Sequence, residues 1–319
     1  MESDSHVEQV RSILDAIESV LLGQRRSAEA LLAGFLADGH VLVEGVPGIG
    51  KTLLAQAAAG ALGLGLKRVQ LTPDFMPADL LGTNIFDAGS GAFRLMRGPV
   101  FSQVLLADEI NRTPPRTQAA LLEAMEERQV TIDGQTHHLD PSFFVIATQN
   151  PIEFEGTYPL PEAQLDRFTL RVSMPPVHGE AELEMLTRAA AGTLAGWGRQ
   201  ARSTSPVVTA DQAAELRRAS LGVHVAPEIL DYVQRLAEGV RSSPHVALGV
   251  SPRALLALME AGRAVALLQG RTFVLPDDIK AMLEPCWGHR ILLEPESELE
   301  GVGTASLLDE VAATVEVPH

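Results

Sequence analysis

Residues 45–52, GVPGIGKT, place a lysine and a hydroxyl at fixed positions in a glycine-rich loop, the pattern GxxxxGK[ST]. Glycines between a strand and a helix let consecutive backbone N–H groups point at phosphate oxygens, and the helix N-terminus adds favourable partial charge. Lys51 would reach the β and γ phosphates of a nucleoside triphosphate, and Thr52 would ligate Mg²⁺. A simple glycine turn would need neither side chain, so the pattern predicts nucleotide binding. The expected contacts come from Gly45, Val46, Pro47, Gly48, Ile49, Gly50, Lys51, Thr52 and Leu53.

A second chemical signal is the acidic pair that ends the apolar run 104–107, Asp108 and Glu109. Hydrolysis of a phosphoanhydride needs a metal ion and a group that orients the attacking water. Asp108 would hold Mg²⁺ directly or through water, and Glu109 would polarise the water. Such a pair is commonly a solvated helix start, but the phosphate loop earlier in the chain favours the catalytic interpretation.

Three polar residues further along the chain could complete the site. Asn150 follows the apolar run 142–148, where an amide could bond the γ-phosphate or hold the water, although a residue before proline is also a common turn former. Arg167 opens the last predicted strand and Arg253 opens a later helix. A guanidinium matches phosphate geometry and stabilises the charge of a transferring phosphoryl group. Each arginine alone would be interpreted as a surface residue. Because both follow the other motifs in order, they are candidate catalytic residues together with Glu109 and Asn150.

A parallel sheet would bring these residues together. Short apolar runs separated by helical segments are typical of parallel strands buried on both faces. They predict strands at residues 41–43, 68–71, 103–107, 142–148 and 168–172. Beyond the two prolines at 175–176 the pattern is helical only, with helices expected at about 178–192, 210–221, 226–240, 252–269 and 276–284.

These elements predict an α/β fold, an αβα sandwich around a five-stranded parallel sheet, followed by a smaller all-α lid domain. The nucleotide-binding core would span residues 1–175, with two β-hairpin insertions at about 83–101 and 129–139. A connecting helix and linker would occupy residues 176–208, and the lid residues 209–319.

Composition narrows the function classes. The formal charge of −16 argues against a surface built to neutralise nucleic-acid phosphates, since that affinity comes from clustered Lys and Arg. The single cysteine, Cys286, agrees with a reducing compartment, and the polar, acidic start of the chain lacks the pattern of a secretion signal. The longest apolar stretch, 53–66, is too short to insert into a membrane. We therefore expect a cytoplasmic protein without a nucleic-acid partner. His137 and His138 are expected to be surface residues rather than metal ligands.

As an ordered set, these motifs resemble the AAA+ ATPases and, within them, the MoxR family. The resemblance covers about residues 10–295. The segments that carry it are LGQ at 22–24, GVPGIGKT at 45–52, LLADEINR at 105–112, ATQNP at 147–151, EGTYPLPEAQLDRF at 155–168 and SPRA at 251–254.

The resemblance implies that the nucleotide is ATP, held with Mg²⁺ between the sheet domain and the lid. Lys51 and Thr52 correspond to Walker A, Asp108 and Glu109 to Walker B, and Asn150 to sensor 1. Arg167 resembles the arginine finger and Arg253 resembles sensor 2, acting on the nucleotide of either its own or a neighbouring subunit. The two hairpins are similar to insertions that face the pore or the substrate surface of the ring.

It also implies a ring oligomer, expected to be a hexamer, that remodels or activates protein clients. Such proteins often work with a partner that carries a von Willebrand factor A domain, and some support metal-cofactor insertion. Two other ATPases remain open, a magnesium-chelatase-type subunit with similar insertions and, less in keeping with the acidic charge, a DNA-directed motor. A further alternative is an ATP-dependent conformational scaffold with little turnover. Glu109, Asn150 and Arg167 together favour hydrolysis over the scaffold.

Overall fold

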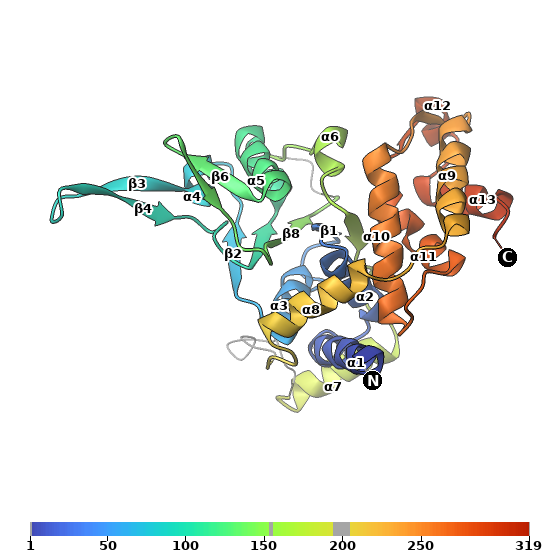
Figure 1. Cartoon of the computed structure of the whole chain (residues 1–319), viewed down its shortest axis with the longest axis horizontal. Helices are drawn as coiled ribbons and strands as arrows, with labels where there is room; N and C mark the ends of the chain where they lie inside the picture. Colours follow the sequence, from blue (N-terminus) through green and yellow to red (C-terminus); the bar gives the residue numbers. More distant parts are fainter. Residues whose placement is uncertain (1, 153–155, 194–204, 319) are drawn as a thin grey trace.

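A computed structural model describes residues 2–152, 156–193 and 205–318, and its centre is a five-stranded parallel sheet (Figure 1). The strand order is β2-β5-β8-β1-β9, and every neighbouring pair is parallel. The strands are β1 (Val41–Glu44), β2 (Leu66–Gln70), β5 (Val104–Asp108), β8 (Phe144–Gln149) and β9 (Leu170–Ser173). The predicted α/β class with five parallel strands is confirmed.

Side chains alternate across the sheet and divide the core into two layers. Val41 and Val43 of β1 pack with the N-terminal helices, whereas Leu42 between them packs with the opposite layer. The N-terminal layer contains α1 (Glu2–Val20), α2 (Arg25–Leu36) and α3 (Lys51–Ala61), and the opposite layer contains α4 (Pro77–Leu81) and α5 (Pro115–Glu127). Because both faces are covered, the central strands are apolar throughout, which explains why their runs were readable from the sequence.

Two antiparallel hairpins project from the sheet domain. β3 (Gly82–Asp87) pairs with β4 (Ala92–Arg97), and β6 (Gln129–Ile132) pairs with β7 (Gln135–His138). Asp133 and Gly134 form the tip of the second hairpin with φ of 48° and 79°, the left-handed geometry that an Asp-Gly turn supplies. The β3–β4 hairpin is a long arm that extends far beyond the globular core (Figure 1).

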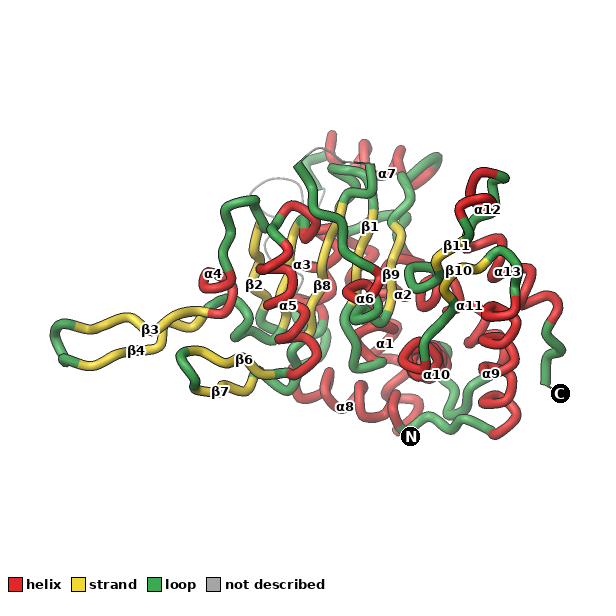
Figure 2. The backbone as a smooth tube through the Cα atoms, turned by 90° about the horizontal axis from the view of Figure 1, so that it is seen from above, coloured by secondary structure: helices red, strands yellow, loops and turns green. Residues whose placement is uncertain are grey.

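Helices α8 to α13 form a lid that packs beside the N-terminal layer (Figures 1 and 2). They are α8 (Ala210–Leu221), α9 (Pro227–Ser242), α10 (Pro252–Leu268), α11 (Pro276–Trp287), α12 (Pro295–Leu299) and α13 (Thr304–Thr314). The preceding helix, α7 (Glu180–Ala190), lies beside α1 instead (Figure 1). The sequence pattern did not predict α12, α13 or the two-stranded ribbon of β10 (Val246–Leu248) and β11 (Leu292–Leu293). Of the expected linker, residues 194–204 lie outside the described residues.

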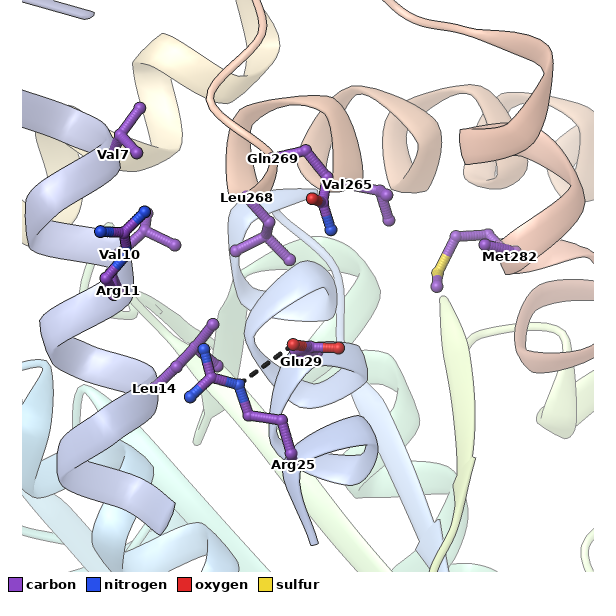
Figure 3. Close-up of a pocket in the computed structure, with 11 residues that line it drawn as sticks. Val7, Val10, Arg11, Leu14, Arg25, Glu29, Val265, Leu268, Gln269 and Met282 are labelled. Atoms are coloured by element: carbon purple, nitrogen blue, oxygen red, sulfur yellow. Dashed lines mark hydrogen bonds and ion pairs between the residues drawn. The ribbon is translucent and has the colours of Figure 1, made fainter. Parts of the chain in front are cut away.

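Lid and sheet domain are joined by buried contacts rather than by the linker alone. Arg217 of α8 donates to Asp38 at 2.9 Å, and its guanidinium lies 4.3 Å from the ring centre of Phe35 in α2. A cavity of about 340 Å³ lies between α1, α2, α10 and α11 (Figure 3). It is lined mainly by apolar side chains, together with Arg25 and its ion-pair partner Glu29, and contains none of the predicted nucleotide contacts. None of the described helices is long and apolar enough to cross a membrane.

Candidate nucleotide-binding site

The phosphate loop connects β1 to α3 through two glycines in the left-handed region. Gly48 has φ of 80° and Gly50 has φ of 103°, and α3 starts directly afterwards at Lys51. The φ of Gly50 would strain any residue with a Cβ, and such a Cβ would also displace Leu21 Cδ1, which would be 2.7 Å away. The first N–H groups of an eleven-residue helix therefore open towards the loop, which is the arrangement that binds phosphate.

Lys51 lies inside this loop. Its Nζ donates to the carbonyl oxygens of Gly45, at 2.5 Å, and of Val46, at 3.2 Å. Burial lowers the pKa of Lys51, while the nearby carboxylates of Asp108 and Glu109 raise it. The ammonium is thus held at the loop by weak carbonyl acceptors, which phosphate oxygens can replace.

Asp108, at the carboxyl end of β5, is the centre of the hydrogen bonding beside the loop. It is 5% exposed, and its Oδ2 accepts from Thr52 Oγ1 at 3.0 Å and from Arg68 Nε at 2.9 Å. Its Oδ1 accepts from Thr148 Oγ1 at 2.6 Å. Thr52 donates a hydrogen bond to the carboxylate, which leaves the lone pairs of its hydroxyl oxygen available to a cation.

The donor set fits Mg²⁺. Magnesium bound to nucleotides takes one or two protein oxygens and obtains its other ligands from phosphates and water. Thr52 and Asp108 provide such oxygens next to the phosphate loop. Among the described residues, no group of three or more His, Cys, Asp and Glu side chains is placed to hold a metal ion.

Glu109 follows Asp108 with an unusual backbone conformation. Its φ is 60°, and its N–H donates to Thr148 Oγ1 at 3.0 Å. The carboxylate accepts from Gln70 Nε2 at 2.6 Å and pairs with Arg112 at 3.3 Å. These contacts hold the carboxylate at the carboxyl edge of the sheet.

Sequence reasoning missed Arg68, Gln70 and Thr148. Arg68 and Gln70 lie on β2, and only the sheet order, with β2 beside β5, brings them to the acidic pair. Thr148 is part of the motif ATQNP at 147–151, but a single threonine in a strand does not indicate that it will make a polar contact. Asn150 itself follows β8 and is 9% exposed, and its Oδ1 accepts from Ile152 N at 3.3 Å. Asn150 therefore forms a turn, as one of the two interpretations predicted, and it also lies at the carboxyl edge of the sheet.

The two candidate arginines lie together, but elsewhere. Arg167 Nη1 is 3.0 Å from Glu126 Oε2, and Arg253 Nη2 is 2.5 Å from Glu126 Oε1. The hydrogen bond from Arg253 lowers the pKa of Glu126. One carboxylate at the end of α5 thus gathers a guanidinium from the sheet domain and one from the lid.

This arginine cluster lies at the amino edge of the sheet. Arg167 precedes β9, whose Leu170 pairs with Val41 at the start of β1, whereas the phosphate loop follows the end of β1. A four-residue strand spans about 10 Å, so the cluster and the phosphate loop are separated by at least that distance along the sheet. α6 (Glu162–Leu165), just before Arg167, lies between α5 and α10 in both views (Figures 1 and 2). The structure therefore brings Lys51 and Thr52 together with the acidic pair, and keeps the arginines apart from them.

Comparisons with known proteins identify the family to which this fold belongs. The family model for the ATPase family associated with various cellular activities matches residues 40–170, and the model for the AAA lid domain matches residues 239–311. The crystal structure of a Cytophaga hutchinsonii protein is similar with a TM-score of 0.89 and 35% identity, covering 99% of this chain and 97% of that one. Fold and site thus define an AAA+ ATPase with a helical lid.

Two relatives narrow the class. Chaperone MoxR1 of Mycobacterium tuberculosis is 38% identical over 312 residues, covering 95% of this chain and 81% of that protein. Protein MoxR of Paracoccus denitrificans is 35% identical over 345 residues, covering 99% and 98%. The chain belongs to the MoxR family, which confirms the resemblance drawn from the motifs.

Proposed function

We propose that this protein is an ATP-hydrolysing MoxR chaperone that works as a ring, which we expect to be a hexamer in the cytoplasm. The observation that carries the proposal is the separation of Arg167 and Arg253 from the phosphate loop of their own subunit. A subunit alone has the groups to bind Mg²⁺–ATP, but neither Arg167 nor Arg253 of that subunit lies at its phosphate loop, where an arginine would stabilise the charge of the transferring phosphoryl group. A neighbouring subunit in a ring would supply it.

Each residue then has a defined role in the proposed reaction. Lys51 and the N–H groups of the loop bind the phosphates, and Thr52 and Asp108 hold Mg²⁺, which would neutralise charge on the phosphates. Glu109 orients and polarises the attacking water, and Asn150 helps to place that water. Gln70 donates to one oxygen of the Glu109 carboxylate, Oε2, and so helps to position it.

The arginines would act in trans. In a single subunit Glu126 holds both guanidiniums, which prevents two like charges from repelling each other at an exposed edge. When this edge meets the phosphate loop of the next subunit, the triphosphate offers a stronger anionic partner than one carboxylate. Arg167 would then contact the γ-phosphate as the finger, and Arg253 would assist from the lid, also on the nucleotide of the neighbouring subunit.

The client of the proposed chaperone is a protein. The relative from M. tuberculosis, Chaperone MoxR1, is named as a chaperone, which supports this. The β3–β4 arm supplies a contact surface, because Phe93 and Phe86 near its tip are 74% and 56% exposed and Met96 near its base is 62% exposed. Large exposed apolar side chains on a projecting arm are typical of interaction sites. A partner with a von Willebrand factor A domain remains part of the proposal through the family.

The proposal is tested by measuring ATPase turnover per subunit against protein concentration, for the parent and for Arg167→Ala. We expect turnover of the parent to fall on dilution as rings dissociate, while nucleotide affinity per subunit stays constant. Arg167→Ala should bind nucleotide normally and lose about a thousandfold in turnover, the usual size of an arginine-finger effect. Parental turnover in Arg167→Ala, or turnover independent of concentration down to monomers, would contradict the ring mechanism.

A further inference from the structure

The short segment 286–290, which ends α11 and follows it, contacts the backbone on which both candidate arginines are mounted. Arg290 is buried, with its side chain 3% exposed, and it is directed at the turn 166–169 that carries Arg167. Trp287 Nε1 donates to Ala254 O at 2.9 Å, in the first turn of the helix that carries Arg253. The segment 286–290 of the lid thus contacts both the turn that carries Arg167 and the helix turn that carries Arg253.

All three guanidinium nitrogens of Arg290 donate to this turn, and one of them also donates to α11. Nε donates to Asp166 Oδ1 at 2.7 Å, and Nη2 donates to the carbonyls of Asp166 at 3.0 Å and Phe168 at 2.9 Å. Nη1 donates to Thr169 O at 3.3 Å and to Cys286 O at 2.6 Å. His289 Nε2 lies 3.0 Å from Phe168 O as well. A planar fork with several simultaneous acceptors fixes a backbone far more tightly than a single contact.

Asp166 extends the network to Arg253. Its carboxylate accepts from Ser251 Oγ at 3.3 Å, and the same hydroxyl accepts from Ala254 N at 3.2 Å as the N-cap of α10. Arg253 lies between these two residues in the sequence. The ion pair of Asp166 and Arg290 therefore fixes the turn before β9 and the start of α10 relative to each other.

We propose that Arg290 is a positioning residue that aims Arg167 and Arg253 at the nucleotide of the neighbouring subunit. The inference rests on the proposed function and deepens it, since it says how a sheet-domain arginine and a lid arginine keep one relative position. Arg290 is buried away from the surface that would face the neighbour, so it acts only through the two arginines. A displacement of about 1 Å in such groups costs about a hundredfold in rate.

The test uses the full chain with Arg290→Gln, with Asp166→Asn as a milder second variant. Arg263→Gln is the matched control, because Arg263 is also a partly buried lid arginine but pairs with Glu260 within α10. For Arg290→Gln we expect nucleotide affinity within about twofold of the parent and turnover reduced about a hundredfold, with a loss of about tenfold for Asp166→Asn. Arg263→Gln should keep parental turnover.

Mixing two kinds of variant subunit distinguishes a loss of arginine positioning from a general loss of structure. Arg290→Gln subunits keep an intact phosphate loop and Glu109, whereas Glu109→Gln subunits keep intact arginines. A 1:1 mixture should recover about one quarter of parental turnover, because about one interface in four combines the two intact halves in the required order. A subunit that was merely misfolded could not be rescued in this way. If Arg290→Gln does not fold, Asp166→Asn is mixed instead, with recovery expected in the same direction.

A parallel mixture of Arg167→Ala with Glu109→Gln distinguishes the two levels of the proposal. Recovery in both mixtures supports the positioning role. Recovery only with Arg167→Ala overturns that role and leaves the ring mechanism standing, and recovery in neither overturns the ring mechanism together with the inference. Parental turnover in Arg290→Gln alone would also overturn the role of Arg290.

Discussion

Thr148 connects the two acidic residues of the site, so replacing it by valine removes two hydrogen bonds without changing the shape of the side chain. Its hydroxyl donates to Asp108 Oδ1 at 2.6 Å and accepts from Glu109 N at 3.0 Å, and the residue is fully buried. In Thr148→Val, the carboxylate loses a donor and the N–H of Glu109 loses its acceptor.

The size of the effect follows from these two contacts. A hydrogen bond to a charged group contributes about 1.5 to 3 kcal/mol, and an unsatisfied buried N–H costs about 1 to 3 kcal/mol. The added methyl group recovers about 0.8 kcal/mol. We expect the free energy of unfolding to fall by about 3 kcal/mol and the melting temperature by about 4 °C. Because Glu109 has φ of 60° and depends on this bond, turnover should fall about tenfold to a hundredfold.

Thermal melting without nucleotide and steady-state ATPase kinetics test this prediction, with Thr148→Ser as the control. Serine keeps the hydroxyl and loses only a buried methyl group, which costs about 1 kcal/mol. We expect Thr148→Ser to melt close to the parent and to retain most of its turnover, and both variants to bind nucleotide like the parent through Lys51. If Thr148→Val melted and turned over like Thr148→Ser, the hydroxyl contacts would have no such role and the reasoning would be refuted.

Three other predictions concern the metal, pH and the lid. With Mg²⁺ present, ATP should raise the melting temperature. EDTA should remove most of that rise, because Thr52 and Asp108 are proposed to hold the ion. If the rise were unchanged in EDTA, the assignment of these two residues to Mg²⁺ would be contradicted. Burial lowers the pKa of His40 to about 3 from 6.5, so the unfolded state takes up the proton first and stability falls as pH drops below 6.5. Urea unfolding of the parent at pH 6.5 and at pH 5 should show that its free energy of unfolding falls by up to about 1.4 kcal/mol per pH unit. His40→Gln should lack this loss, and an equal pH dependence in the two proteins would refute the assignment to His40. Arg217→Met should lower the free energy of unfolding by about 2 kcal/mol by removing the contact to Asp38, measured by urea unfolding, whereas no loss would show that this contact does not join the lid to the core.

Much of the fold, the phosphate loop and the acidic pair were predictable, because each leaves a signal within a short stretch of sequence. Strands buried on both faces leave continuous apolar runs, and a phosphate loop needs its glycines, lysine and threonine within eight consecutive residues. Asp108 and Glu109 end such a run, so their place at the carboxyl edge followed from the pattern.

The remainder depends on sheet order and on contacts between distant segments. Arg68 and Gln70 meet the acidic pair only because β2 lies beside β5. Arg290 stands in the segment WGHR, where nothing local indicates that it binds a turn more than a hundred positions earlier. The ribbon of β10 and β11 was missed because strands of three and two residues leave no periodic pattern.

The central claim is that each nucleotide is completed by arginines from the next subunit. Its most direct test is a structure of the Glu109→Gln protein assembled with Mg²⁺–ATP. We predict a closed ring in which Lys51 and Thr52 of one subunit and Arg167 of its neighbour contact the same triphosphate, with Arg167 released from Glu126. A nucleotide-bound assembly in which Arg167 and Arg253 still pair with Glu126 at every interface would contradict the claim.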